Sequence, residues 1–190
     1  MSREKRYYCM SRIRSKGTKP ELAVRRHLFS LGYRFRVNVK TLPGHPDIVL
    51  PRYRTAIFVN GCFWHAHEGC RYNTRPSTNR LFWEEKRLRN RERDLEVIQL
   101  LEAMQWNVIT LWECQLKPKC FNETMNGLIL QIRENGKIWE KSEHERKVAK
   151  AEALEKSRMS RKKREAVEME LASKFNISRR RLRVVPDKNV

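Results

Sequence analysis

The chain has 190 residues, of which 39% are hydrophobic, so it is long enough for one domain with a buried core. No apolar run approaches the roughly 20 residues of a membrane span, and MSREKRYYCM at the start lacks the apolar stretch of a secretory signal. We expect a soluble, intracellular protein with no membrane partner. The formal net charge of +20 favours a polyanion as the partner. We expect nucleic acid and not an acidic membrane surface, because no strongly amphipathic basic helix dominates the sequence.

The first elements follow from local patterns. Residues 18–21 (TKPE) form a capping box with a proline just inside, which predicts a helix that stops near Gly32. We expect that helix to bury Leu22, Leu28 and Leu31. Residues 33–40 (YRFRVNVK) alternate strictly between apolar and polar, which predicts a half-buried strand.

Short apolar strands and two helices complete the predicted fold. Residues 47–50 (DIVL) and 55–60 (TAIFVN) predict a hairpin around PRYR, and residues 107–113 (NVITLWE) predict another strand. Residues 81–104 read as a long helix, basic in its first half, and residues 122–136 as another. The order helix, three strands, helix, strand, helix predicts an α/β sandwich, in which helices flank a mixed sheet.

The composition changes near residue 141. Residues 141–190 carry 16 Lys and Arg against 8 Asp and Glu, and almost no aromatic residue up to residue 171. We expect a domain at residues 1–140 followed by a basic helical arm or tail at 141–190. MELASKFNISRRRLRVV (169–185) also resembles the later half of a helix-turn-helix, and a tail without a nucleic-acid role is the third alternative.

Four residues have the spacing of a metal site. Cys62, His67 and Cys70 lie close together in a loop, and Cys114 follows a later strand. Thiolates with an imidazole suit tetrahedral Zn²⁺, and four protein ligands leave no position for water, which indicates a structural role. The alternative is a set of ordinary buried cysteines. The other two cysteines, Cys9 and Cys120, match no ligand position.

The chain resembles the Vsr family, the very short patch repair endonucleases. The matching stretches are MSRIRSKGTKPE, LPGHPDIVLPRYRTAIFVNGCFWHAHEGC, FWEEKRLRNRERD and NVITLWEC, which cover about residues 9–135. The resemblance implies a restriction-endonuclease-like fold, zinc at the four positions above, and a Mg²⁺-dependent reaction. That reaction nicks one strand of duplex DNA 5′ to a thymine mispaired with guanine, leaving a 3′-hydroxyl and a 5′-phosphate.

The resemblance also assigns catalytic residues. Asp47 matches the family's metal-binding carboxylate, although a turn-capping role is the alternative from the sequence alone. The second Mg²⁺ contact is a backbone carbonyl that matches Val59. His65 matches the residue that transfers a proton, and the spacing leaves open that His65 binds zinc in place of His67.

Two further site positions are less settled. Glu21 matches a family residue near the catalytic water, yet it is equally the glutamate of the capping box. Asn60 stands where many family members carry a second active-site histidine. An asparagine can hydrogen-bond a phosphate or water but cannot titrate, which leaves the pH dependence of the reaction open.

Aromatic and basic residues form the expected DNA-binding surface. Phe63, Trp64 and Trp83 match the family aromatics that insert beside the mismatch, with core packing as the alternative. Met10 matches a residue that acts from an N-terminal arm. The helix start offers phosphate contacts from Lys86, Arg87, Arg89, Asn90 and Arg93, unless that face is simply solvated.

We therefore expect a zinc-stabilised, Mg²⁺-dependent mismatch endonuclease that acts as a monomer in the cytoplasm, at nucleoid DNA, with mismatch-repair proteins as candidate partners. Two alternatives stay open. One is a non-catalytic zinc DNA-binding module, and the other is a restriction-type nuclease with a different site preference. Neither the flanking bases of the target nor the role of residues 141–190 follows from the sequence.

Overall fold

The computed structural model describes residues 4, 5, 7, 8, 12 and 16–175. Within this part the elements are α2 (Lys19–Ser30), β1 (Ile48–Leu50), the 3₁₀ turn η1 (Pro51–Tyr53), β2 (Thr55–Asn60), α3 (Arg80–Ala103), β3 (Asn107–Trp112) and α4 (Pro118–Phe175). The chain divides into two compact units, Met1–Trp139 and Glu140–Val190. No helix of the described residues has the length and apolar character to cross a membrane.

A three-stranded mixed sheet forms the centre of the first unit. β1 and β2 are the predicted hairpin, antiparallel with Ile48 opposite Ile57, and η1 makes the turn between them. β3 lies parallel to β2 with Thr55 opposite Asn107, and α3 is the crossover that a parallel connection requires. The strand order is β1-β2-β3, so β2 is central. The molecule is therefore of the α/β class, as predicted.

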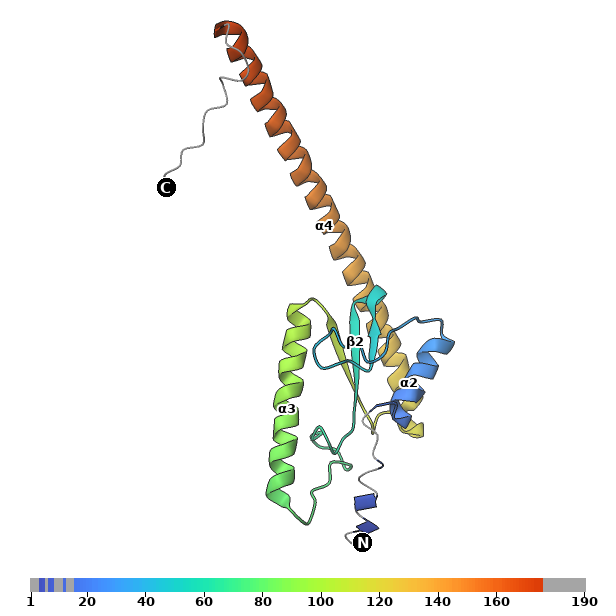
Figure 1. The fold of residues 1–190 in the computed structure, drawn as a ribbon. Coiled ribbons are helices and arrows are strands. Elements are labelled where there is room, and N and C mark those ends of the chain that lie inside the picture. Colours follow the sequence, from blue (N-terminus) through green and yellow to red (C-terminus); the bar gives the residue numbers. More distant parts are fainter. Residues whose placement is uncertain (1–3, 6, 9–11, 13–15, 176–190) are drawn as a thin grey trace. The chain divides into compact units, whose positions relative to one another are not determined.

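Helices cover both faces of this sheet. Alternate strand residues point to opposite faces, so Ile48, Leu50 and Ile57 pack with Val24 and Leu28 of α2 and with the start of α4. The other face carries Val49 and Ala56, which pack with Leu101 of α3. Figure 1 shows α3 on one side of the strands and α2 on the other.

The α2 helix begins with the predicted capping box. Thr18 is the N-cap, its side chain accepts from the Glu21 amide, and the Glu21 side chain accepts from the backbone of Thr18. The buried stripe consists of Glu21, Val24 and Leu28. The prediction that Leu22 and Leu31 point inward is wrong: they are 39% and 51% exposed. Leu22 lies outside the buried stripe, and Leu31 is the C-cap, one residue past the end of the helix.

The predicted strand at residues 33–40 is also wrong. This segment makes only an isolated antiparallel bridge between Arg36 and Val49. Asn38 has a φ of 48°, in the left-handed region, which ends any extended run, and Val37 is exposed. The segment buries Tyr33 and packs Phe35 and Val39 partly against the core clusters, so its apolar alternation, apart from Val37, faces the core without forming a strand.

The two long helices agree with the predictions in position but differ in extent. α3 matches the predicted helix within one residue at each end, and it buries Leu101 while Leu100 and Met104 are exposed. α4 continues far beyond the predicted residues 122–136, to Phe175. Its part in the first unit buries Met125, Leu128 and Ile132.

Gly44 lies in the turn before β1 and touches α3. Its φ is +69°, and an added Cβ would overlap Cγ1 of Val97. Gly44→Ala should therefore lower the free energy of unfolding by about 1–3 kcal/mol, measured by urea denaturation, because it adds volume to a filled interface. Gly32→Ala is the control, since Gly32 also has a positive φ, +84°, but has open space around it. An equal loss in both variants would attribute the effect to backbone strain alone.

Candidate active site and metal centre

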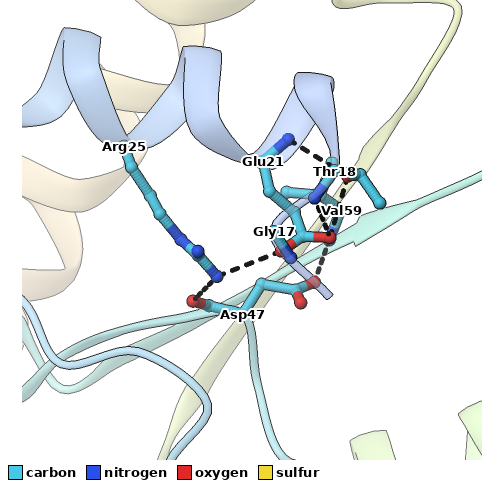
Figure 2. A network of polar contacts seen from close by, with 6 residues as sticks. All are labelled: Gly17, Thr18, Glu21, Arg25, Asp47 and Val59. Atoms are coloured by element: carbon cyan, nitrogen blue, oxygen red, sulfur yellow. Dashed lines mark hydrogen bonds and ion pairs between the residues drawn. The ribbon is translucent and has the colours of Figure 1, made fainter. Parts of the chain in front are cut away.

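The Asp47 carboxylate lies at the end of the β1–β2 ladder. β2 runs past the start of β1, and there the Val59 amide donates to Oδ2 of Asp47 at 2.8 Å (Figure 2). The amide and carbonyl of one strand residue point to the same side, so the Val59 carbonyl is directed toward the Asp47 edge too. No hydrogen bond is made by the second carboxylate oxygen, Oδ1, to the described residues. Asp47 and the Val59 carbonyl thus offer two oxygen ligands on one edge of the sheet.

Burial raises the pKa of Asp47 above its ordinary value. The Val59 amide opposes this rise, the nearby Glu21 carboxylate adds to it, and Arg25 and His65 oppose it. Two carboxylates near one another in a partly desolvated site favour a bound cation, because a cation offsets both their repulsion and their loss of hydration. The donor set is all oxygen, which suits a hard divalent cation such as Mg²⁺.

Glu21 is fully engaged by protein donors. Its carboxylate accepts from the Gly17 amide at 2.9 Å, from the Thr18 hydroxyl at 2.8 Å and from Arg25 at 3.1 Å, and the residue is 3% exposed. The same Nη2 of Arg25 donates to the Asp47 carbonyl at 2.9 Å (Figure 2). Glu21 therefore holds the start of α2 and, through Arg25, the backbone of Asp47. The sequence analysis did not identify Arg25, although it lies four residues after Glu21, on the same helix face.

A loop with no regular secondary structure follows β2 and contains a cluster of metal-ligand side chains. The ligand atoms of Cys62, His67, Cys70 and Cys114 all lie within 4.8 Å of one another. Cys114 Sγ lies 3.4 Å from His67 Nδ1, and the His67 ring stacks on Trp112 with centroids 4.0 Å apart. The cluster joins the loop to the end of β3, and it could hold one metal ion. Cys120 is half-buried and is not part of it.

Burial raises the pKa of the Cys62 thiol to about 12, with Cys114 and Cys70 as hydrogen-bonding neighbours. A thiol with such a pKa keeps its proton at neutral pH, whereas coordination to a dication replaces the proton. Three sulfurs and one imidazole at this separation have the chemistry of a tetrahedral site for a borderline-soft metal such as Zn²⁺.

His65 is not one of the four ligands of the cluster and pairs with α3. Its Nδ1 forms a hydrogen bond with Oδ2 of Asp94, and its backbone amide donates to the Gly61 carbonyl at 3.2 Å. A carboxylate on Nδ1 favours the tautomer that carries its proton there and leaves Nε2 to exchange a proton with a substrate. The sequence analysis missed Asp94. The spacing of Lys86, Asn90 and Asp94 could have identified it, because it places an acid on the helix face that carries the predicted DNA contacts.

Phe63, Trp64 and Trp83 form one aromatic cluster. Ring centroids lie 5.1 Å apart for Phe63–Trp64, 5.4 Å for Phe63–Trp83 and 5.7 Å for Trp64–Trp83. All three are half-buried, and none belongs to either core cluster of the sheet. Phe82 is exposed and extends the cluster, since its ring lies 5.3 Å from Trp83. These rings sit on the loop that carries His65 and on the first turn of α3.

The basic residues of α3 have different surroundings. Lys86 Nζ lies 5.6 Å from the Trp64 ring and 5.5 Å from the Trp83 ring, and Asn90 donates to the Trp64 carbonyl at 2.9 Å. Arg93 is exposed. The prediction that Arg87 lies on a phosphate-facing surface is wrong, because it is only 8% exposed and donates to Asn73 beneath the Phe63 ring.

Three predicted positions contribute little or fall elsewhere. Asn60 ends β2, and its backbone carbonyl accepts from the Glu113 amide at 2.9 Å, with no side-chain hydrogen bond to the described residues. Met10 and Cys9 lie outside the described residues, as does the predicted helix-turn-helix segment from residue 176 onward.

The sequence of this chain is similar to those of known proteins. The sequence model of the family described as "DNA mismatch endonuclease Vsr" matches residues 1–71. The type II nicking enzyme V.NmeAIP of Neisseria meningitidis is 44% identical over 131 residues, which cover 68% of this chain and 93% of that protein. The chain belongs to the Vsr DNA mismatch endonuclease family.

Further Vsr-type relatives agree with this membership. The type II nicking enzyme V.XorIIP of Xanthomonas oryzae is 48% identical over 116 residues, covering 61% of this chain and 85% of that protein. The DNA mismatch endonuclease Vsr of Escherichia coli is 42% identical over 103 residues, covering 52% and 65% respectively. The predicted family and the predicted endodeoxyribonuclease activity are thereby confirmed, and the chain is an endonuclease that nicks DNA in repair.

The Cys/His cluster gives a direct prediction for metal content. Purified protein should contain one metal ion per chain, and Cys114→Ser should lower both the metal content and the midpoint of thermal unfolding, because the cluster joins the loop to β3. Cys120→Ser is the matched control, since Cys120 lies outside the cluster. Elemental analysis that finds the same metal content in both variants would remove Cys114 from the site.

Proposed function

We propose that this protein is a Mg²⁺-dependent, zinc-stabilised endonuclease that nicks one DNA strand 5′ to a thymine mispaired with guanine and so initiates very short patch repair. One observation carries the proposal. The loop after β2 carries Phe63 and Trp64 of the aromatic cluster directly before His65, and His65 is paired to Asp94. An aromatic surface beside a proton-transfer residue suits a nick at a distorted base step, and a relative carries the name DNA mismatch endonuclease.

Asp47 and the Val59 carbonyl would hold the Mg²⁺. Bound there, the ion would neutralise charge on the scissile phosphate and lower the pKa of a water molecule. The chain's own part is to keep these two oxygens on one sheet edge. Arg25 fixes the Asp47 backbone, and Glu21 fixes Arg25. We assign Glu21 this holding role, since four donors from Gly17, Thr18 and Arg25 already occupy its carboxylate.

His65 would move the proton of the reaction at Nε2. Asp94 keeps the Nδ1 proton in place and stabilises the imidazolium that forms when Nε2 accepts a proton. Asn60, at the end of β2, would orient a water molecule or a phosphate oxygen without titrating.

Zinc would bind Cys62, His67, Cys70 and Cys114 as a structural ion. Binding of this kind contributes on the order of 10 kcal/mol to folding in small zinc domains that have no large core of their own. This chain has a core cluster on each face of its sheet, so the effect of zinc would be confined to the loop that carries His65, Phe63 and Trp64. The zinc would keep these side chains in position against α3.

The aromatic cluster would recognise the mispair by wedging. Separating a base step costs roughly a few kcal/mol, and less at a mispair that is already weak, so this difference discriminates T:G from T:A. Phe63, Trp64 and Trp83 would insert, Lys86, Asn90 and Arg93 would contact the backbone and base edges nearby, and Met10 would act from the N-terminal segment.

The wider setting is part of the same proposal. We propose a restriction-endonuclease-like domain over residues 1–140, acting as a monomer on duplex DNA in the cytoplasm, at the nucleoid, together with mismatch-repair proteins. A non-catalytic DNA-binding module and a restriction-type nuclease are the alternatives. Nicking of a duplex with one T:G pair, and not of its T:A counterpart, separates the proposal from both.

Asp47→Asn should abolish nicking while the fold persists, because an amide oxygen still accepts from Val59. Without metal, the unfolded chain loses this proton near pKa 3.8 and the folded chain loses it at a higher pH. The native state therefore binds more protons in that window, and stability falls as the pH rises through it. The side-chain amide in Asp47→Asn has no proton to lose, so the variant does not lose stability in this way. At neutral pH it should therefore unfold at an equal or higher temperature than the metal-free wild type.

Mg²⁺ completes this test. It should raise the unfolding temperature of the wild type and leave that of Asp47→Asn unchanged, since a ligand stabilises only the state that binds it. Equal Mg²⁺ stabilisation of both proteins, measured by scanning calorimetry, would place the ion elsewhere.

His65→Ala should slow single-turnover nicking by about 10²-fold or more, the usual range for lost acid–base help. Asp94→Ala should slow it by at least about tenfold, because the imidazole loses its fixed tautomer. Glu96→Ala, which removes an exposed acid from the same helix, is the control and should keep the wild-type rate. A normal rate in Asp94→Ala would show that the pair has no part in the reaction.

Trp64→Ala should lose discrimination between T:G and T:A duplexes before it loses general affinity, because phosphate contacts remain. The measurement is the ratio of dissociation constants for the two duplexes at fixed salt. Phe29→Ala, an exposed aromatic residue on α2, is the control and should keep the ratio. An unchanged ratio of dissociation constants in Trp64→Ala would show that the aromatic cluster packs within the protein and does not discriminate the mispair.

A further inference from the structure

The helical part of the second unit contains a basic segment that the proposed function does not use. Residues 156–164 read KSRMSRKKR, with six Lys and Arg and no acid. All nine residues are exposed. Arg161 pairs with Glu165 at 2.9 Å, and no ion pair joins the other five bases to a carboxylate of the described residues. These charges are therefore available to an external anion.

The bases cover the helix on all sides. At about 100° per residue, Lys156 and Lys163 share one side, Arg158 and Lys162 another, and Arg161 and Arg164 a third. An amphipathic membrane helix needs an apolar face with Trp, Phe or Leu opposite its basic face, and this segment has none. No aromatic residue occurs from residue 141 to residue 174, so stacking on single-stranded bases has no platform either.

Self-association through this helix is not favoured by the sequence. The exposed apolar residues recur at intervals of six, five, eight, two and two, which form no continuous heptad seam; they are Val148, Leu154, Met159, Val167, Met169 and Leu171. Residues 156–164 therefore present a dense positive charge without an apolar or aromatic surface. Such a segment is suited to phosphates, which Lys and Arg side chains contact without reading the sequence.

We propose that residues 156–164 bind the sugar–phosphate backbone of duplex DNA, outside the nicking site and independently of sequence. The segment spans about 12 Å of helix axis, and duplex DNA presents on the order of seven phosphates over that length. Binding would release counterions and keep the enzyme on DNA while it searches for a rare mispair. This inference rests on the proposed action on duplex DNA, and not on T:G specificity.

The test compares two variants of the full chain with equal charge loss. In the block variant, Lys156, Arg158, Lys162 and Lys163 are changed to Gln, which keeps helix propensity. In the control variant, Lys141, Lys147, Lys150 and Lys174 are changed to Gln; these lie in the same unit, and Lys147 and Lys174 already pair with Glu143 and Glu170. Affinity for a fully matched duplex is measured from low to moderate salt, with helix content checked by circular dichroism.

In the block variant, the slope of log binding constant against log salt concentration should become shallower by about 2–4. Each lost phosphate contact removes about 0.9 from this slope. The control variant should change the slope by less than about 1, and the single-turnover nicking rate at saturating DNA should be unchanged in both. Equal flattening in the two variants, or none in the block variant, overturns the inference. A change in the flanking sequence that is cut also overturns the inference, because it would mean that the segment contacts base edges in a groove. Because the duplex is matched, the result stands even if T:G specificity fails.

Discussion

We propose that metal binding at the Cys62–His67–Cys70–Cys114 cluster is the constraint on which the site depends. The loop between β2 and α3 has no regular secondary structure, so its shape depends on a few backbone hydrogen bonds and on this cluster. Every residue that we assign to proton transfer or wedging from this loop lies between Cys62 and His67. A side chain between two anchored residues has a better defined position than the same side chain in an unanchored loop of this length. Cys114 extends the anchoring to the sheet, where Asp47 lies.

One stripe of α3 meets both the loop and the sheet. Its members recur every three or four residues and change character along the helix, from Trp83, Arg87, Asn90 and Asp94 to Val97 and Leu101. The apolar half packs in the core, and this packing fixes the rotation of the helix. The polar half is thereby held against the loop, where Asn90 bonds Trp64 and Asp94 bonds His65. Fold stability and site geometry therefore share one interface.

Local signals in the sequence predicted most of the fold. The capping box, the hairpin and the long helix were right because each is determined within a few neighbouring residues. The strand at 33–40 failed because alternation alone does not say whether a partner strand exists, and Asn38 interrupts it. Arg25 and Asp94 were missed because their roles come from contacts 22 and 29 residues away. Arg87 was misplaced because a charged residue on a basic helix face is usually solvated, whereas here Asn73 and Phe63 enclose it.

The central claim is that a metal-anchored loop, and not the loop sequence alone, positions His65. The most direct measurement removes zinc with a selective chelator, dialyses the protein into Mg²⁺ buffer, and follows single-turnover nicking of a T:G duplex before and after zinc is returned. We expect nicking to fall by about 10²-fold or more, because the acid–base group is no longer placed. Zinc should restore it, while helix content changes little. A zinc-free protein that nicks at the full rate would contradict the account.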